Sequence, residues 1–199
     1  MKFFILLFLF ANLVAQDDYS LRVAYGKVTS SDFGEILVGN IHSHPNDLNV
    51  LSLDGGYLFQ QNTLDLPIDT YVKAGLSYFD EDGMHHDVFE FTLYIKLYYN
   101  IDFLDNRVRF GFGEGGSYTE SLLYAEVLEA RQKQGNNSRF LNYIDLSLDV
   151  DLGKLIRYRD LEGTTFGWAL KHRSGIYGLV NNVRHGGSNY NTFYIETKF

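Results

Sequence analysis

The sequence of 199 residues contains no cysteine and only two prolines. Without cysteine, the chain has neither a disulfide framework nor a thiolate for catalysis or metal binding. Its formal net charge is −8 and no block of basic residues stands out, which argues against a nucleic-acid partner. After the first fifteen residues, no apolar run is long enough to span a membrane as a helix, which needs about 20 residues.

The N-terminal segment has the pattern of an export signal. Met1-Lys2 gives a short positive start, the run from Phe3 to Phe10 is entirely apolar, and Ala15 offers a small residue for cleavage. A membrane-anchoring helix is the alternative, but the apolar run is too short for one. We expect a signal peptide over residues 1–15 and one domain over residues 16–199.

The rest of the chain is rich in glycine, tyrosine and phenylalanine, with 19, 15 and 16 residues respectively. Eight segments alternate apolar and polar residues, as a strand with one apolar face does. Their first apolar residues are Leu21, Leu51, Val72, Phe89, Val108, Ile144, Phe166 and Phe193. A soluble sandwich shows the same alternation. The charged polar faces, the strand lengths of about ten residues and the aromatic end at Phe199 favour an all-β, eight-stranded antiparallel transmembrane β-barrel of the bacterial outer membrane.

The connections divide into short and long sets. If both termini are periplasmic, residues 61–69, 100–106 and 158–165 form periplasmic turns, and residues 29–46, 80–87, 113–139 and 180–189 form surface loops. Residues 122–134 are expected to form a helix in the third surface loop. In the lumen, we expect ion pairs between two sets of side chains, Asp145, Asp149 and Asp151 with Arg107, Arg109 and Lys96.

The seventh segment departs from its own pattern. His172 and Ser174 share the parity of Phe166, Trp168 and Leu170, so they are expected on the lipid-facing side, where a polar residue costs free energy. An imidazole beside a serine can accept its proton and make it a nucleophile. A chance His-x-Ser pair, a parity-reversing bulge near Gly175 or a place in the aqueous rim would each be an inert explanation.

The segment KHRSGIYGLVNNVRHGGSNYNTFYIETKF, residues 171–199, resembles the end of the PagL-type lipid A 3-O-deacylases, an outer-membrane acyloxyacyl hydrolase family. The resemblance implies an eight-stranded barrel that hydrolyses an ester-linked acyl chain of lipid A. It also implies that His172 is the general base and Ser174 the nucleophile. Asn182, with Asn181 beside it, occupies the spacing of the family's oxyanion-stabilising asparagine.

The acidic third member of the family's triad has no counterpart here, because Gly186 occupies its position. Glu196 is expected to point into the lumen. Glu114 is the better substitute, since it shares the outward parity of Phe112, although two strand spacings of roughly 10 Å separate it from His172. A His–Ser dyad without an acid and a catalytically inactive relative of the family are the alternatives.

The sequence therefore favours a lipid A deacylase acting on lipopolysaccharide in the outer leaflet without a cofactor. The rival functions are a non-enzymatic structural or small-solute barrel and a lipid acyltransferase. The loop histidines His42 and His44 with Asp47, and the run from His85 to Asp87, are interpreted as solvated loops and not as metal sites. Which acyl chain is removed, and whether the protein forms a homodimer, are left open.

Overall fold

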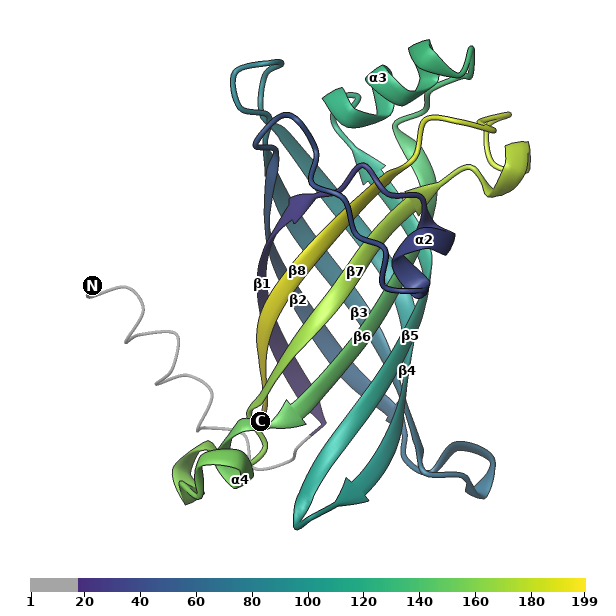
Figure 1. Cartoon of the computed structure of the whole chain (residues 1–199). Coiled ribbons are helices and arrows are strands. Elements are labelled where there is room, and N and C mark those ends of the chain that lie inside the picture. The colour runs from purple at the N-terminus through teal and green to yellow at the C-terminus, as the bar shows by residue number, and fades with distance from the viewer. Residues whose placement is uncertain (1–17) are drawn as a thin grey trace.

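The computed structural model describes residues 18–199 as a closed antiparallel barrel in which each strand pairs with its sequence neighbours and β1 pairs with β8 (Figure 1). The expected signal peptide over residues 1–15 lies outside the described residues. Within them, no helix is long and apolar enough to cross a membrane. The strands are β1 (Tyr19–Val28), β2 (Asn49–Gln60), β3 (Ile68–Asp80), β4 (Val88–Phe103), β5 (Asn106–Thr119), β6 (Phe140–Asp151), β7 (Thr165–Ser174) and β8 (Ser188–Lys198).

The outer wall of the barrel is apolar along all eight strands, with the parity that the sequence predicts. In β4, for example, Phe89, Leu93 and Ile95 are exposed, while the intervening Glu90, Tyr94 and Lys96 are buried in the lumen. An apolar wall around a sheet without edges is the arrangement that lipid requires, since every backbone group is paired inside the barrel. The fold and this wall together define an outer-membrane type of β-barrel.

The lumen is filled by buried ion pairs. Arg22 lies 2.8 Å from Asp145 and 3.3 Å from Asp54, and Lys96 also pairs with Asp145. Around this centre lie further pairs, Lys73–Glu196, Arg109–Asp149, Lys171–Glu90 and Arg173–Glu126. Charges buried in this way stay tolerable because each has an opposite partner and further hydrogen bonds.

Two ion pairs between the expected sets are confirmed, and the expectation is wrong for the two remaining residues, Arg107 and Asp151. Asp145 pairs with Lys96, and Asp149 pairs with Arg109 at 2.7 Å. Arg107 instead pairs with the exposed Asp102 at the β4–β5 hairpin, because Arg107 lies near the start of β5, beyond the enclosed part of the lumen. Asp151 forms no ion pair within residues 18–199. Its carboxylate instead caps α4 (Leu152–Ile156) by accepting the N–H of Lys154 at 2.9 Å.

Four expected connections differ from the structure by more than two residues. One is the last surface loop, which covers residues 175–187 and not 180–189. The β4–β5 turn is only Leu104 and Asp105, both left-handed as a tight hairpin of matching twist requires, and not residues 100–106. The β6–β7 connection covers residues 152–164, with α4 and the short helix η2 (Arg159–Leu161). Residues 113–116 belong to β5 and not to a loop. Gly113 is needed there because a Cβ would lie 3.0 Å from the Tyr94 ring, which crosses the lumen.

The long connections gather at one end of the barrel, and the short turns with the C-terminus lie at the other (Figure 1). The first of the short turns contains η1 (Thr63–Asp65). At the long-loop end, called here the surface end, α3 (Tyr124–Gln132) confirms the expected helix and lies across the lumen opening. Its buried Glu126 bonds to Arg173 at 2.7 Å and accepts from Ser188 at 2.8 Å.

The first surface loop, residues 29–48, takes a different course. Called loop 1 here, it folds back along the outside of the barrel and carries α2 (Phe33–Leu37) over the outer wall of β7 (Figure 1). Loop 4, residues 175–187, contains the short helix η3 (Ile176–Gly178) and joins β7 to β8. These two loops and α3 enclose the region that the sequence singled out.

Replacing Asp145 by alanine tests the lumen network. The change leaves Arg22 and Lys96 buried without their shared carboxylate, so we expect a loss of about 3–5 kcal/mol in the free energy of unfolding. Urea titration of the refolded barrel in lipid vesicles would measure it. The control is Asp102→Ala, which removes an exposed pair and is expected to leave the unfolding midpoint unchanged. Equal effects of the two changes would contradict a stabilising lumen network.

The contact of α3 with the rest of the surface end is expected to weaken at alkaline pH. Glu81, in the loop after β3, accepts the N–H of Tyr124 at 2.5 Å, and burial raises its pKa from 4.5 to about 7. Because the folded pKa is the higher one, this contribution to stability is complete below 4.5 and is lost as the pH rises through 7. Hydrogen exchange of the α3 amides, corrected for its intrinsic pH dependence, should show easier opening above neutral pH. Glu81→Gln should abolish this trend, and a trend that persists in the variant would assign it to another group.

Candidate active site

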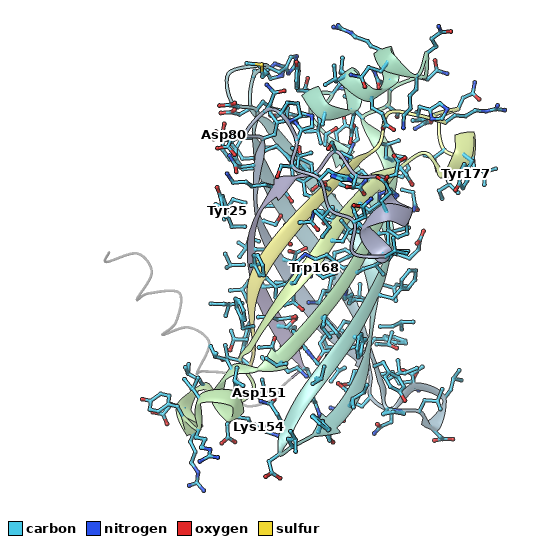
Figure 2. All side chains as sticks on the ribbon, viewed as in Figure 1. Tyr25, Asp80, Asp151, Lys154, Trp168 and Tyr177 are labelled. Atoms are coloured by element: carbon cyan, nitrogen blue, oxygen red, sulfur yellow. The ribbon has the colours of Figure 1, made fainter. Side chains whose placement is uncertain are left out.

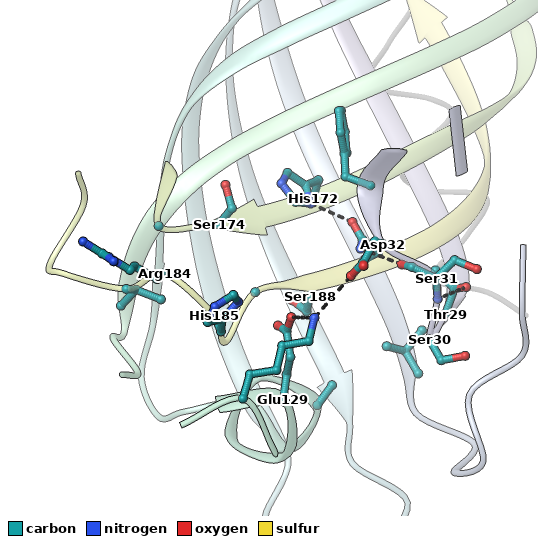
Figure 3. Close-up of a pocket in the computed structure, with 18 of the residues that line it drawn as sticks. Thr29, Ser30, Ser31, Asp32, Glu129, His172, Ser174, Arg184, His185 and Ser188 are labelled. Atoms are coloured by element: carbon teal, nitrogen blue, oxygen red, sulfur yellow. Dashed lines mark hydrogen bonds and ion pairs between the residues drawn. The ribbon is translucent and has the colours of Figure 1, made fainter. Parts of the chain in front are cut away.

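A cleft of about 910 Å³ opens on the outer wall at the surface end of the barrel (Figure 3). Its floor is formed by outward-facing residues of β5 to β8, and its sides by loop 1, α3 and loop 4. The cleft is therefore outside the barrel and separate from the packed lumen. Among its lining residues are His172, Ser174 and Glu114, three of the residues predicted from the sequence.

His172 and Ser174 lie on the outward face of β7, at its C-terminal end, as strand parity predicts. The lumen-facing neighbours Lys171 and Arg173 are buried in ion pairs, while His172 and Ser174 are half-buried in the cleft. No bulge reverses the parity in β7, because its register with β6 and β8 is continuous. Their catalytic roles remain predictions.

The His172 ring is oriented by a residue that the sequence analysis did not select. Asn189, directly opposite His172 in β8, places its Oδ1 atom 2.6 Å from His172 Nδ1. Asn189 Nδ2 in turn donates to the carbonyl oxygen of Ser31 in loop 1 at 3.0 Å. A carbonyl only accepts, so the amide nitrogen must face Ser31 and the amide oxygen must face His172.

This orientation determines the tautomer of the neutral ring. Because Asn189 Oδ1 accepts, His172 Nδ1 carries the proton and Nε2 keeps its lone pair. Nε2 is then the atom that can accept a proton from a nucleophile. An asparagine oriented through its oxygen thus performs the positioning part of the role of a triad carboxylate.

Loop 1 also holds the ring from the side. The Phe33 ring, at the start of α2, lies 4.5 Å from the His172 ring, measured between centroids. Ile36 and the outward-facing Leu170 are both buried, which shows that α2 packs on the wall beside the histidine. Loop 1 therefore contacts the candidate base both directly and through Asn189.

Ser174 and His172 are not hydrogen-bonded to each other within residues 18–199. Residues two apart on a strand have their Cα atoms roughly 6.6 Å apart, so a rotation of the side chains is needed to bring Oγ to Nε2. Catalytic hydrogen bonds often tighten only when a substrate is bound. The two side chains thus lie on one face of β7, close enough to form a hydrogen bond after rotation.

Glu114 lies in the same row of the outer wall as His172, but Ile144 stands between them. The registers pair Glu114 with Ile144 and Ile144 with His172, so two strand spacings of about 10 Å separate the carboxylate from the ring. Residues 113–116, expected from the sequence to begin a surface loop, are paired on both sides within β5 and so cannot fold over toward His172. The structure does not bring Glu114 to His172, and its triad role stays a prediction.

Asn181 and Asn182 lie in loop 4, exposed and outside the lining of the cleft. The Asn181 amide donates to Ser138 Oγ and to the carbonyl oxygen of Phe140, both at 2.9 Å. Asn182 contacts Asn136 through its backbone carbonyl. Neither is brought to Ser174, so the oxyanion role of both also stays a prediction.

The backbone after Ser174 offers donors instead. Gly175 has φ −88° and ψ 9°, and Ile176 and Tyr177 follow with φ of 47° and 54°. A right-handed residue followed by a left-handed one turns successive N–H groups toward one concave point, which suits an anion. Within the described residues, the N–H groups of Gly175 and Ile176 have no hydrogen-bond acceptor.

The described residues contain no group of three histidine, aspartate or glutamate side chains that could hold a metal ion. His44 Nδ1 bonds locally to Asn46, and the rings of His85 and His86 lie against each other with centroids 4.1 Å apart.

Comparison with known proteins supports the fold. Neither a family model nor a curated protein sequence matches the chain. Among solved structures, the chain is similar to the outer membrane enzyme PagL, with a TM-score of 0.58 and 12% identity over 90% of this chain and 99% of that one. It is also similar to Neisserial surface protein A, with a TM-score of 0.52 and 10% identity over 92% and 98% of the chains. The class is therefore that of the eight-stranded outer-membrane barrels, and at this identity the likeness extends to the fold alone.

The Asn189 contact predicts a specific ring tautomer. We expect the ¹⁵N resonances of neutral His172, assigned by difference from a His172→Gln variant, to show the proton on Nδ1. Asn189→Leu should shift the population toward the Nε2–H form, whereas Asn189→Asp, which can only accept when ionised, should keep the proton on Nδ1. An unchanged tautomer in Asn189→Leu would show that Asn189 does not orient the ring.

Proposed function

We propose that this protein is an outer-membrane ester hydrolase that removes an ester-linked acyl chain from lipid A in the outer leaflet. The observation that carries the proposal is the outward-facing pair of His172 and Ser174, with His172 Nδ1 held by Asn189 in a cleft on the lipid-facing wall. Polar side chains on a lipid-facing wall cost free energy, so their presence there indicates a function. The fold likeness to an outer membrane enzyme, PagL, supports the proposal at the level of architecture.

The proposed reaction is acyl transfer to Ser174 followed by hydrolysis. Ser174 Oγ attacks the ester carbonyl while His172 Nε2 takes its proton, and the N–H groups of Gly175 and Ile176 stabilise the oxyanion. The imidazolium returns the proton to the departing sugar oxygen, which leaves an acyl-serine. Water, deprotonated by His172, then attacks the acyl-serine, and the imidazolium returns that proton to Ser174 Oγ as the Oγ–acyl bond breaks and a fatty acid is released.

The cleft suits an acyl chain beside a polar centre. Ile144 and Ile176 line it next to the pair, and Val183, Ala125 and Leu128 contribute from loop 4 and α3. Because the acyl chain comes from a bilayer that is as apolar as this lining, the lining gives little net transfer energy and instead keeps the chain out of water while the ester lies at the polar centre. A lipid enters from the same side of the wall on which the nucleophile lies.

A non-enzymatic surface barrel is the second candidate. Two observations favour it: Ser174 and His172 share no hydrogen bond in the described chain, and the ring's partner is an amide and not a carboxylate. In addition, the fold of this chain is similar to that of Neisserial surface protein A. An acyltransferase would use the same first step and pass the acyl group to another lipid instead of water.

The decisive change is Ser174→Ala. Mass spectrometry of lipid A from cells that carry the wild-type protein should show loss of one acyl chain, and the variant should leave lipid A intact with a normally folded barrel. Ser30→Ala is the matched control, because Ser30 is an exposed serine in the lining of the same cleft. Lipid A of unchanged mass in the presence of the wild-type protein would favour the surface-barrel alternative, and transfer of the chain to a second lipid would identify an acyltransferase.

A further inference from the structure

Two apolar projections flank the cleft, and neither belongs to a strand. One is the end of α2, where Leu37 is 59% exposed and Val38 81%. The other is the η3 region of loop 4, where Tyr177 is 93% exposed and Leu179 84%. Tyr177 projects sideways from the barrel and not along its axis (Figure 2). Apolar side chains of this exposure would be costly in water.

The position of α2 indicates what covers its outer side. Its inner residues Phe33 and Ile36 contact the outer wall, so Leu37 and Val38 face away from the barrel, in the direction in which the wall itself faces lipid. A surface helix bathed in water carries polar residues on its outer side. Here the exposed Leu37 and Val38 lie beside a single charged residue of the helix, Glu35, whose carboxylate accepts the N–H of Asp32.

The backbone of η3 gives an independent indication. Ile176 and Tyr177 both adopt left-handed conformations, with φ of 47° and 54°, which cost about 1–2 kcal/mol per bulky residue. Glycine or asparagine would relieve this cost, yet the chain has an isoleucine and a tyrosine there. Both residues border the cleft, but Ile176 is half-buried there while Tyr177 is almost fully exposed and projects outward, so the strained turn holds a large side chain away from the barrel. Tyrosine is also the residue type that favours the membrane–water interface.

We propose that α2 and η3 are immersed in the outer leaflet and form the two sides of a lateral entrance, through which a lipid acyl chain reaches the cleft. The occupant of the surface they present is the acyl-chain region of the bilayer. The second surface loop behaves differently: it projects beyond the rim of the barrel (Figure 1) and contains Glu81, Asp82, His85 and His86 beside the exposed Met84. Membrane contact is therefore assigned to these two segments and not to the surface end as a whole.

Site-specific fluorescence tests the proposal on the full-length protein. Trp168 is the single tryptophan, so Trp168→Phe gives a silent background in which Val38→Trp, Tyr177→Trp and Met84→Trp each add one reporter. The three proteins would be reconstituted into phosphatidylcholine vesicles with or without bromine atoms in the acyl chains, and titrated with aqueous iodide. We expect bromolipid to remove most of the emission of the Val38→Trp and Tyr177→Trp proteins and iodide to have little effect on them. The Met84→Trp protein should show the reverse.

Iodide quenching of Val38→Trp and Tyr177→Trp as strong as that of Met84→Trp, without quenching by bromolipid, would overturn the proposal. A heat-modifiable gel shift of each variant shows that the barrel is folded before it is measured. The test does not depend on hydrolysis, so it can succeed even when Ser174→Ala leaves lipid A unchanged, and it can fail for an active enzyme.

Discussion

The closure of the sheet is the constraint on which the rest of the structure depends. In lipid, a strand edge would leave unpaired N–H and C=O groups, and pairing β1 with β8 removes the last of them. Closure then divides the side chains of every strand into two environments by strict alternation. Charged residues such as Arg22 and Asp145 are sent to the lumen, where they pair, and apolar residues to the wall. A polar side chain at a wall position therefore departs from the pattern. The surface end of β7 has two, His172 and Ser174, at consecutive outward positions.

His172, the first of the two, is connected to loop 1 by a short chain of contacts. Ser31 in loop 1 fixes the Asn189 amide, Asn189 fixes the His172 ring, and Phe33 packs on that ring. The orientation of the candidate base therefore depends on loop 1 staying against the wall. If the outer side of α2 is immersed in lipid, the membrane itself holds loop 1 in place. The candidate site would then be fully oriented only in a bilayer, a form of control that needs no moving lid.

The sequence predicted the parts of this arrangement that follow from local periodicity. All eight strands, their parity and the outward position of His172 and Ser174 could be predicted because alternation is recorded residue by residue. What depends on register could not. Asn189 is a partner of His172 only because the β7–β8 hairpin pairs these two positions, and that pairing depends on the length and turns of loop 4. The same gap explains Arg107 and Asp151, whose parity was right but whose height along the barrel put them at the turns.

The replacement of a carboxylate by Asn189 has a physical consequence for the proposed chemistry. An acid beside His172 would stabilise the imidazolium formed when Ser174 loses its proton, but it would also be a charge on the lipid-facing wall in the resting state. A neutral amide avoids that resting cost and still determines the tautomer, because its Oδ1 accepts from Nδ1. The positive ring is then balanced only by carboxylates of the same cleft that do not contact it, Glu129 of α3, whose charge acts on His172, and Glu114, which lies two strands away in register. Positioning without charge stabilisation favours a slow enzyme, one whose rate rests on orientation and on the backbone N–H groups after Ser174.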